Sequence, residues 1–265
     1  MRRRAPVRNV LLAAFLALSL RGACATATPA DAAAFAWQAH PGAQVPPDTV
    51  LRDESGRTVP LRQFLGSQPV ILDLGYFRCP ALCGVVRADL LNALRGSGLV
   101  EGRDYRLVAL SIDPAETPKE AAQAKEGDLS QAPFATGADW HYVTGSAESV
   151  AAVTQAVGFR DRYDSRFRQF LHPTGLVVLT KAGVVSGYLL GVGFAGGDLR
   201  ASVLRAQDGG IAQTALPILL LCFHYDAATG HYTLAIEKVL RLMGLLTVVT
   251  LGGLLLALHW PKAVP

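Results

Sequence analysis

Two closely spaced cysteines are the residues of this chain best suited to chemistry. Cys79 and Cys83 form a C-P-A-L-C segment between a short apolar run and a stretch with helical spacing. A separation of four residues can place both sulfur atoms on one side of a first helical turn, where the helix dipole favours thiolates. Two thiolates are soft ligands that select copper(I), zinc or an iron–sulfur cluster. In an oxidising compartment the pair could instead form a structural or redox disulfide.

His172 is the best candidate for a third ligand. A stable metal site needs more ligands than two thiolates, and imidazole suits both copper and zinc. His172 precedes Pro173-Thr174 at the entrance to a predicted hairpin, so we expect it on a loop at the start of a strand. The alternative interpretation of His172, taken alone, is a surface histidine.

Three other chemistries compete for the cysteine pair. A thiol–disulfide oxidoreductase usually spaces its cysteines C-x-x-C, one residue closer than here. A thiol peroxidase of related fold normally carries Thr or Ser three residues before its reactive cysteine, where this chain has Tyr76. A blue-copper electron carrier uses two histidines, one cysteine and usually a methionine, but the methionines here are Met1 and Met243. Metal binding and thiol exchange therefore remain open.

A few further residues carry weaker signals. Cys222 and His224 form a C-x-H motif after an apolar run. Their simpler interpretation is an apolar cysteine and a surface histidine, and the alternative is a second metal contact or a contact with a partner protein. Asp161 and Asp164 could supply an oxygen ligand to copper(II), but nothing in their spacing requires it.

The elements that must position these residues follow from the apolar pattern. Strands alternating with helices predict an α/β sheet with helices on both faces, hence three layers, and a final hairpin makes the sheet mixed. Cys79 falls at the carboxyl end of a central strand, where sites form in open α/β sheets. We expect strands at 49–51, 58–61, 69–75, 105–112, 140–143, 175–180 and 184–190, and helices at 82–95, 118–127, 146–158 and 197–207.

The N-terminus has the features of a signal peptide. Four arginines lie within the first eight residues, an uncharged apolar run covers residues 10–20, and Ala23-Cys24-Ala25 offers a cleavage site. The alternative is an uncleaved anchor. An exported chain would place the central domain outside the cytoplasm, on the periplasmic side of the inner membrane.

The C-terminus has the features of a transmembrane helix. Leu242 to Leu258 contains no charged residue, and Trp260 follows at a suitable interface position. The segments divide the chain into a signal peptide (1–25), a linker (26–48), a folded domain (49–207), a juxtamembrane segment (208–237) and a transmembrane helix (238–261).

The charge balance argues against nucleic acid as a partner. The chain holds 25 Lys and Arg and 21 Asp and Glu. Five of the arginines and none of the acids lie in residues 1–25, so removal of that segment leaves 20 against 21, a net charge of −1. A near-neutral chain without a basic cluster lacks the electrostatic signature of nucleic-acid binding.

Several separated segments together resemble the Sco/SenC family of thioredoxin-like copper proteins. Residues 76–83 (YFRCPALC) look like the family's aromatic-x-x-C-P-x-x-C segment, and residues 111–118 (SIDPAETP) are similar to its S-x-D-P-x-x-D-T-P stretch, with Glu116 where Asp is usual. Residues 140–145 (WHYVTG) resemble its W-x-x-L-T-G turn. His172 lies 89 residues after Cys83, close to the family's separation. The resemblance covers about residues 45–205.

The resemblance implies a thioredoxin-like fold and a copper site made by Cys79, Cys83 and His172. It also implies a metallochaperone that receives copper from a donor chaperone and delivers it to the cytochrome c oxidase subunit carrying the binuclear copper centre. The alternative is a thiol–disulfide reductase in which Cys79 and Cys83 reduce the cysteines of that centre. We expect an assembly factor in preference to a turnover enzyme. Two departures are that Leu171 replaces the usual Asp before the histidine, and that the membrane segment is C-terminal.

Overall fold

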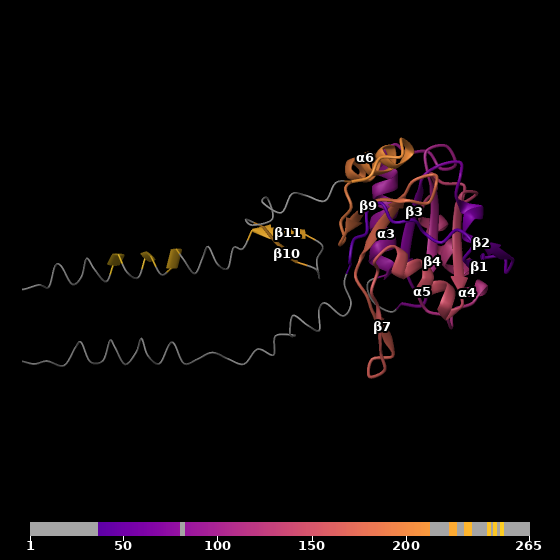
Figure 1. Ribbon diagram of the computed structural model, residues 1–265, viewed down its shortest axis with the longest axis horizontal. Helices are drawn as coiled ribbons and strands as arrows, with labels where there is room; N and C mark the ends of the chain where they lie inside the picture. Colours follow the sequence, from indigo (N-terminus) through magenta and orange to yellow (C-terminus); the bar gives the residue numbers. More distant parts are fainter. Residues whose placement is uncertain are drawn as a thin grey trace, which may run out of the picture.

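The computed structural model describes residues 37–79, 83–212, 223–226, 231–234, 243–244, 246–247 and 250–251. For Cys83 and for strands β10 (Phe223–Asp226) and β11 (His231–Leu234) it describes the backbone alone. The main folded unit lies within residues 37–212 and is drawn in indigo to orange in Figure 1.

A seven-stranded mixed sheet forms the centre of the domain, in the order β2-β1-β5-β4-β3-β8-β9. The three central strands β5, β4 and β3 are parallel, whereas β1 and β8 pair with them in antiparallel orientation. This confirms the mixed sheet and the terminal hairpin that the sequence predicts. The strands are β1 (Val50–Arg52), β2 (Thr58–Pro60), β3 (Val70–Gly75), β4 (Arg106–Ser111), β5 (Trp140–Gly145), β8 (Gly175–Leu179) and β9 (Val185–Leu190).

Helices cover both faces of the sheet, as expected for three layers (Figure 1). Helices α3 (Cys83–Ser97), α4 (Pro118–Gln131) and α6 (Gly196–Gln207) pack on one face. Helix α5 (Ala147–Ala156) and the short 3-10 helix η1 (Leu61–Phe64) pack on the other. Strand β3 contributes to both cores because successive side chains alternate between faces: Leu72 packs on the α5 side and Ile71 on the α3 side.

Helix α4 is longer than predicted. Gly127 was expected to end it, but the helix continues to Gln131. Asp128 on the added turn is buried and accepts a hydrogen bond from the Tyr142 hydroxyl at 2.7 Å. This tertiary contact outweighs the cost of an internal glycine, which is about 1 kcal/mol.

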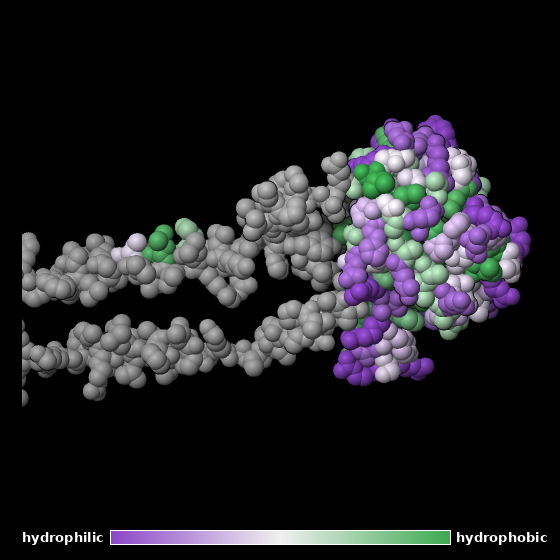
Figure 2. All heavy atoms as spheres, viewed as in Figure 1, coloured by the Kyte–Doolittle hydropathy of each residue, from purple (hydrophilic) through white to green (hydrophobic). Residues whose placement is uncertain are grey.

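A small hairpin that the sequence analysis did not predict precedes His172. Strands β6 (Arg162–Asp164) and β7 (Gln169–Leu171) pair in antiparallel orientation and extend from the domain at the bottom of Figure 1. Figure 2 shows a mainly hydrophilic surface there. Tyr163 and Phe167 are nevertheless exposed.

The folded unit begins before residue 49, so the second half of the expected linker (26–48) packs on the domain. Trp37 is 9% exposed, and its ring lies 5.0 Å from Phe159 and 5.4 Å from Tyr188. The Trp37 indole N–H donates to the Thr174 carbonyl at 3.0 Å. Val45 is fully buried in the same core.

The terminal segments lie largely beyond the described residues. The predicted signal peptide (1–25) is entirely outside them, and only six residues of the predicted transmembrane helix (238–261) are described. No helix among the described residues has the length and apolar character needed to cross a bilayer. Cys222 is also outside the described part of the chain.

Candidate functional site

Cys79 is the last residue of a tight turn at the carboxyl end of β3. The turn comprises Tyr76 to Cys79, and the Cys79 amide donates to the Tyr76 carbonyl at 3.3 Å. The end of β3 is fixed beside β4 because the Ile112 amide donates to the Gly75 carbonyl at 2.7 Å. Cys79 is half-buried and packs against the core on the α5 side of the sheet. Its expected location at a strand end is therefore confirmed.

Cys83 is the first residue of helix α3. This agrees with the expectation that the second cysteine lies at a helix N-terminus, where the helix dipole favours a thiolate. Residues 80–82 and the Cys83 side chain are outside the described part of the structure. The convergence of the two sulfur atoms on one ligand therefore remains a prediction.

His172 lies between β7 and β8, as expected for a residue at the entrance to a strand. Strand β8 runs antiparallel to β3 with Asp73 opposite Leu176, so the start of β8 lies beside the end of β3. The His172 ring is 5.9 Å from the Tyr76 ring and 5.7 Å from the Phe159 ring, measured between centroids. Tyr76 therefore touches His172 and belongs to the turn that leads to Cys79.

The orientation of the His172 ring suits a metal ligand. Its Nδ1 atom lies 2.9 Å from the Pro173 carbonyl oxygen. A carbonyl can only accept, so Nδ1 carries the proton and donates in this contact. Metal-binding histidines commonly use this arrangement, in which a backbone carbonyl fixes the tautomer and the ring orientation.

The described residues do not by themselves form a complete metal site. No group of three or more His, Cys, Asp or Glu side chains within them could hold an ion. The chemistry of the expected set, two thiolates and one imidazole, fits copper or zinc. Of this set the structure describes the Cys79 and His172 side chains and only the backbone of Cys83.

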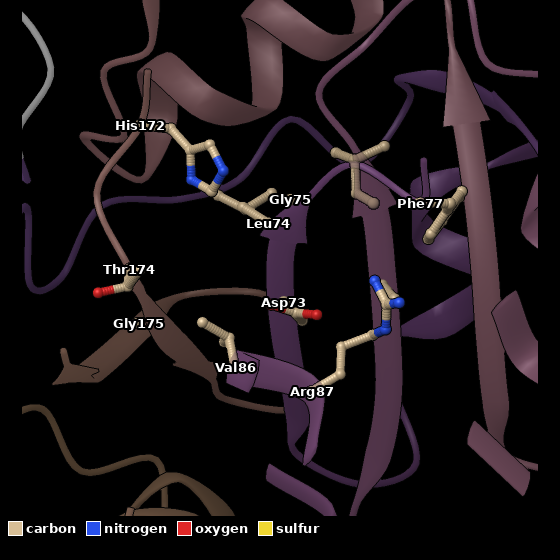
Figure 3. Close-up of a pocket in the computed structure, with 11 residues that line it drawn as sticks. Asp73, Leu74, Gly75, Phe77, Val86, Arg87, His172, Thr174 and Gly175 are labelled. Atoms are coloured by element: carbon tan, nitrogen blue, oxygen red, sulfur yellow. The ribbon is translucent and has the colours of Figure 1, made fainter. Parts of the chain in front are cut away.

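A small cavity of about 10 Å³ lies behind His172, with room for roughly one water molecule. In Figure 3 the His172 ring stands at one end of it, and the Asp73 carboxyl and the Arg87 side chain stand at the other. Asp73 projects from the middle of β3 and is 7% exposed. Burial raises the pKa of Asp73 to about 6. Among the neighbouring charges, Arg87 and His172 lower this pKa and Asp128 raises it.

Arg87 connects this cavity to a buried polar cluster under α3 and α4. Its Nε atom lies 3.1 Å from a carboxylate oxygen of Asp128, which also accepts from the Tyr142 hydroxyl. Burial, followed by the neighbouring Asp128 charge, raises the pKa of Tyr142 well above its usual value. Tyr142 therefore stays a neutral donor, and the cluster holds α3 against the sheet below the site.

The structure separates the two aspartates proposed as extra ligands. Asp164 accepts from the backbone N–H of Arg166 at 2.9 Å and from its guanidinium at 2.8 Å, so this carboxylate serves the β6–β7 turn. Asp161, by contrast, interacts electrostatically with His172. Burial raises the pKa of Asp161, and the His172 charge partly offsets this rise. His224 lies on β10, where only the backbone is described.

Glu116 is a site residue whose role sequence analysis missed. Its side chain is fully buried, and it accepts hydrogen bonds from the backbone N–H groups of Phe77 and Arg78 at 2.8 and 2.6 Å. The only signal in the sequence was its place in the SIDPAETP stretch, which does not show where the carboxylate points. Asp73 was also missed, although a lone acid inside the apolar run PVILDLG is a visible anomaly.

Comparison with known proteins decides the family. The SCO1/SenC family model matches residues 38–192, which is more than half of the chain. The chain belongs to the SCO1/SenC family. A comparison with curated proteins finds no significant match.

Solved structures similar to this SCO1/SenC protein have the same thioredoxin-like fold. A protein of Aquifex aeolicus VF5, described as an electron transfer protein, has a TM-score of 0.57 and 24% identity over 63% of this chain and 94% of its own. A second Aquifex structure, described as an electron transport protein, has a TM-score of 0.53, 24% identity and coverage of 63% and 98%. Arabidopsis thaliana ScoI with copper bound has a TM-score of 0.50, 17% identity and coverage of 64% and 98%.

Proposed function

We propose that this protein binds a copper ion through Cys79, Cys83 and His172 and delivers it to cytochrome c oxidase during assembly. Copper is the cargo in this function. The observation that supports it best is the position of His172: the β3–β8 pairing brings the residue to the sheet end that carries Cys79, and the Pro173 carbonyl holds its Nδ1 atom at 2.9 Å. Family membership supports the same metal, since a SCO1/SenC relative has been crystallised with copper.

The donor set is consistent with carrying copper and releasing it. Thiolate ligands favour copper(I), whereas the imidazole can bind either oxidation state. Cys79 and His172 are half-buried, not sealed in the core, so a partner protein has access to the metal. The turn and loop that carry them lie at the end of the sheet, outside the regular hydrogen-bonded strands.

The test is a copper titration of the full-length purified protein, kept reduced, against a chromophoric copper(I) competitor. We expect one copper ion per chain, no binding in C79A or C83A, and weaker binding in H172A. His141 provides a matched control, because it is a half-buried imidazole on β5, two strands away from β3. H141A should bind like the wild type. Full-strength binding by C83A would refute the site.

A second candidate function is the reduction of the cysteines of the oxidase copper centre. It is favoured by the position of Cys83 at a helix N-terminus, which promotes a reactive thiolate. A deletion strain separates the two functions. Rescue of oxidase activity by added copper supports delivery, whereas rescue by an added thiol reductant alone supports thiol exchange.

We also propose that residues 238–261 anchor the protein in the inner membrane after export directed by residues 1–25, with the copper domain on the periplasmic side. The supporting features are the two apolar segments of the sequence and their flanking basic residues. Protease treatment of intact spheroplasts tests this arrangement. The domain should be degraded without lysis, and protection until lysis would contradict it.

A further inference from the structure

The buried carboxylate of Glu116 is fully enclosed by groups that donate hydrogen bonds. One oxygen, Oε2, accepts from the Phe77 N–H at 2.8 Å and from the Ser111 hydroxyl at 2.6 Å. The other, Oε1, accepts from the Arg78 N–H at 2.6 Å and lies 3.5 Å from the Arg78 guanidinium Nε. All four partners are donors, so this environment suits a side chain whose two terminal oxygens both accept.

These contacts complete the hydrogen bonding of the turn that carries Cys79. Phe77 and Arg78 occupy the two central positions of the turn, and the Cys79 N–H closes it on the Tyr76 carbonyl. Without Glu116 the two central N–H groups would have no partner in this arrangement. The carboxylate therefore fixes both the shape of the turn and its distance from β4.

The loop after β4 is itself folded so that it presents Glu116 to the turn. The Glu116 N–H donates to the Asp113 carbonyl at 3.0 Å, and the Asp113 carboxylate accepts from the Ala115 N–H at 2.9 Å. Ser111 accepts from the Asp113 N–H at 3.1 Å. The parallel pairing of Gly75 with Ser111 brings this loop beside the end of β3. Glu116 thus links two loops that are almost 40 residues apart in sequence.

We propose that Glu116 is a positioning residue for the copper site: it clamps the Cys79 turn so that the Cys79 sulfur is held at the distance from His172 that a shared copper ion requires. This inference rests on the proposed copper site. Tyr76 makes the coupling direct, because its backbone closes the turn and its ring packs on His172. A looser turn would therefore displace both the Cys79 backbone and the Tyr76 ring that packs on His172.

Glu116→Gln is the variant that tests the clamp. The amide has nearly the same size, but its NH2 group faces donors, so it cannot satisfy both backbone N–H groups and Ser111. Removing such outer contacts typically weakens metal binding about 10- to 100-fold. We expect E116Q to bind copper(I) at least about tenfold more weakly and, when fully loaded with copper(II), to show a shifted thiolate-to-copper charge-transfer band.

Asp53 supplies an unusually close control. It is also a buried carboxylate that closes a turn, accepting from the N–H groups of Ser55 and Arg57 at 3.0 and 2.9 Å and from the Ser55 hydroxyl at 2.6 Å. It follows β1, three strands away from β3. D53N should lower the melting temperature as E116Q does, yet keep wild-type copper affinity and the wild-type absorption band.

The outcomes separate this inference from the proposed function. If the wild type binds no copper, the proposed function fails first. If the wild type binds copper and E116Q matches it in affinity and spectrum, or differs from it no more than D53N does, the positioning role is refuted. Hydrogen exchange on the wild-type apo-protein tests the clamp without any variant: the Phe77 and Arg78 amides should be protected, and exchange at the rate of an unstructured peptide would overturn the proposal.

Discussion

Replacement of Asp73 by Asn should reduce the loss of stability that the protein undergoes as the pH rises. Asp73 is a single carboxyl on a central strand, packed on the α3 side of the sheet beside Arg87. Burial disfavours its charged form and raises its pKa from 3.8 to about 6. The nearby Arg87 guanidinium limits the rise without cancelling it.

The magnitude follows from the linkage between protonation and folding. The folded protein holds the Asp73 proton more tightly than the unfolded chain does, so this group favours folding most below about pH 4, and the benefit is lost as the pH rises through about 6. A shift from 3.8 to about 6 corresponds to about 3 kcal/mol, at about 1.36 kcal/mol per pKa unit. Asn carries no ionisable proton, so D73N escapes this loss.

The assay is urea unfolding of copper-free, reduced wild type and D73N between pH 4 and pH 8. The difference in unfolding free energy, D73N minus wild type, should increase by about 2.5 kcal/mol over this range, because part of the effect is already present at pH 4, and should level off above about pH 7. Its absolute value at pH 4 reports the unrelated cost of burying an amide. A difference that does not change with pH, or one that decreases as the pH rises, would refute the assignment of Asp73 as a group protonated more readily in the folded state.

Three further substitutions test the packing around the site. Tyr142→Phe removes the donor to Asp128 and should lower the free energy of unfolding by about 1.5–3 kcal/mol in a urea titration; an unchanged midpoint would contradict that hydrogen bond. Gly158→Ala should lower the melting temperature strongly, because Gly158 has φ +69° and a Cβ would lie 1.6 Å from the Gln38 carbonyl oxygen; a wild-type melting curve would exclude this close approach. Trp37→Ala should cost about 3–5 kcal/mol in unfolding free energy, and wild-type stability would show that the N-terminal segment does not belong to the folded unit.

The regular elements could be predicted because their signals are local. The apolar runs at 69–75 and 105–112 contain the two central strands β3 and β4, and the Ser146 cap starts α5, where its side chain accepts from the Ser149 N–H at 3.2 Å.

The elements that the sequence did not predict share a physical cause. Trp37 lies in an Ala- and Pro-rich stretch with no periodicity, and only its tertiary contacts with Phe159 and Tyr188 order it. The arginine-rich β6–β7 hairpin has little of the alternation that marks a half-buried strand.

The sequence could predict the candidate ligands of the site, but not the residues that surround them and hold them in position. Residue type and spacing single out Cys79 and His172 as candidate ligands, since ligands must be chemically suitable. Glu116 acts through the reach of its side chain between two loops, and neither its type nor its local pattern indicates which N–H groups it meets. Asp73 owes its raised pKa to burial in the folded protein and, to a smaller extent, to the Asp128 charge on α4, which is distant in sequence.

The antiparallel pairing of β3 with β8 also determines when the site can exist during synthesis. Residue 79 is made early, whereas β8, which fixes the position of His172, ends only at Leu179. The β4, α4, β5 and α5 segments must be made in between. Closing so long a loop is entropically costly and occurs late in folding. A growing chain therefore presents its two thiols about 90 residues before the histidine joins them, so the proposed three-ligand copper site can form only after β8 has been made.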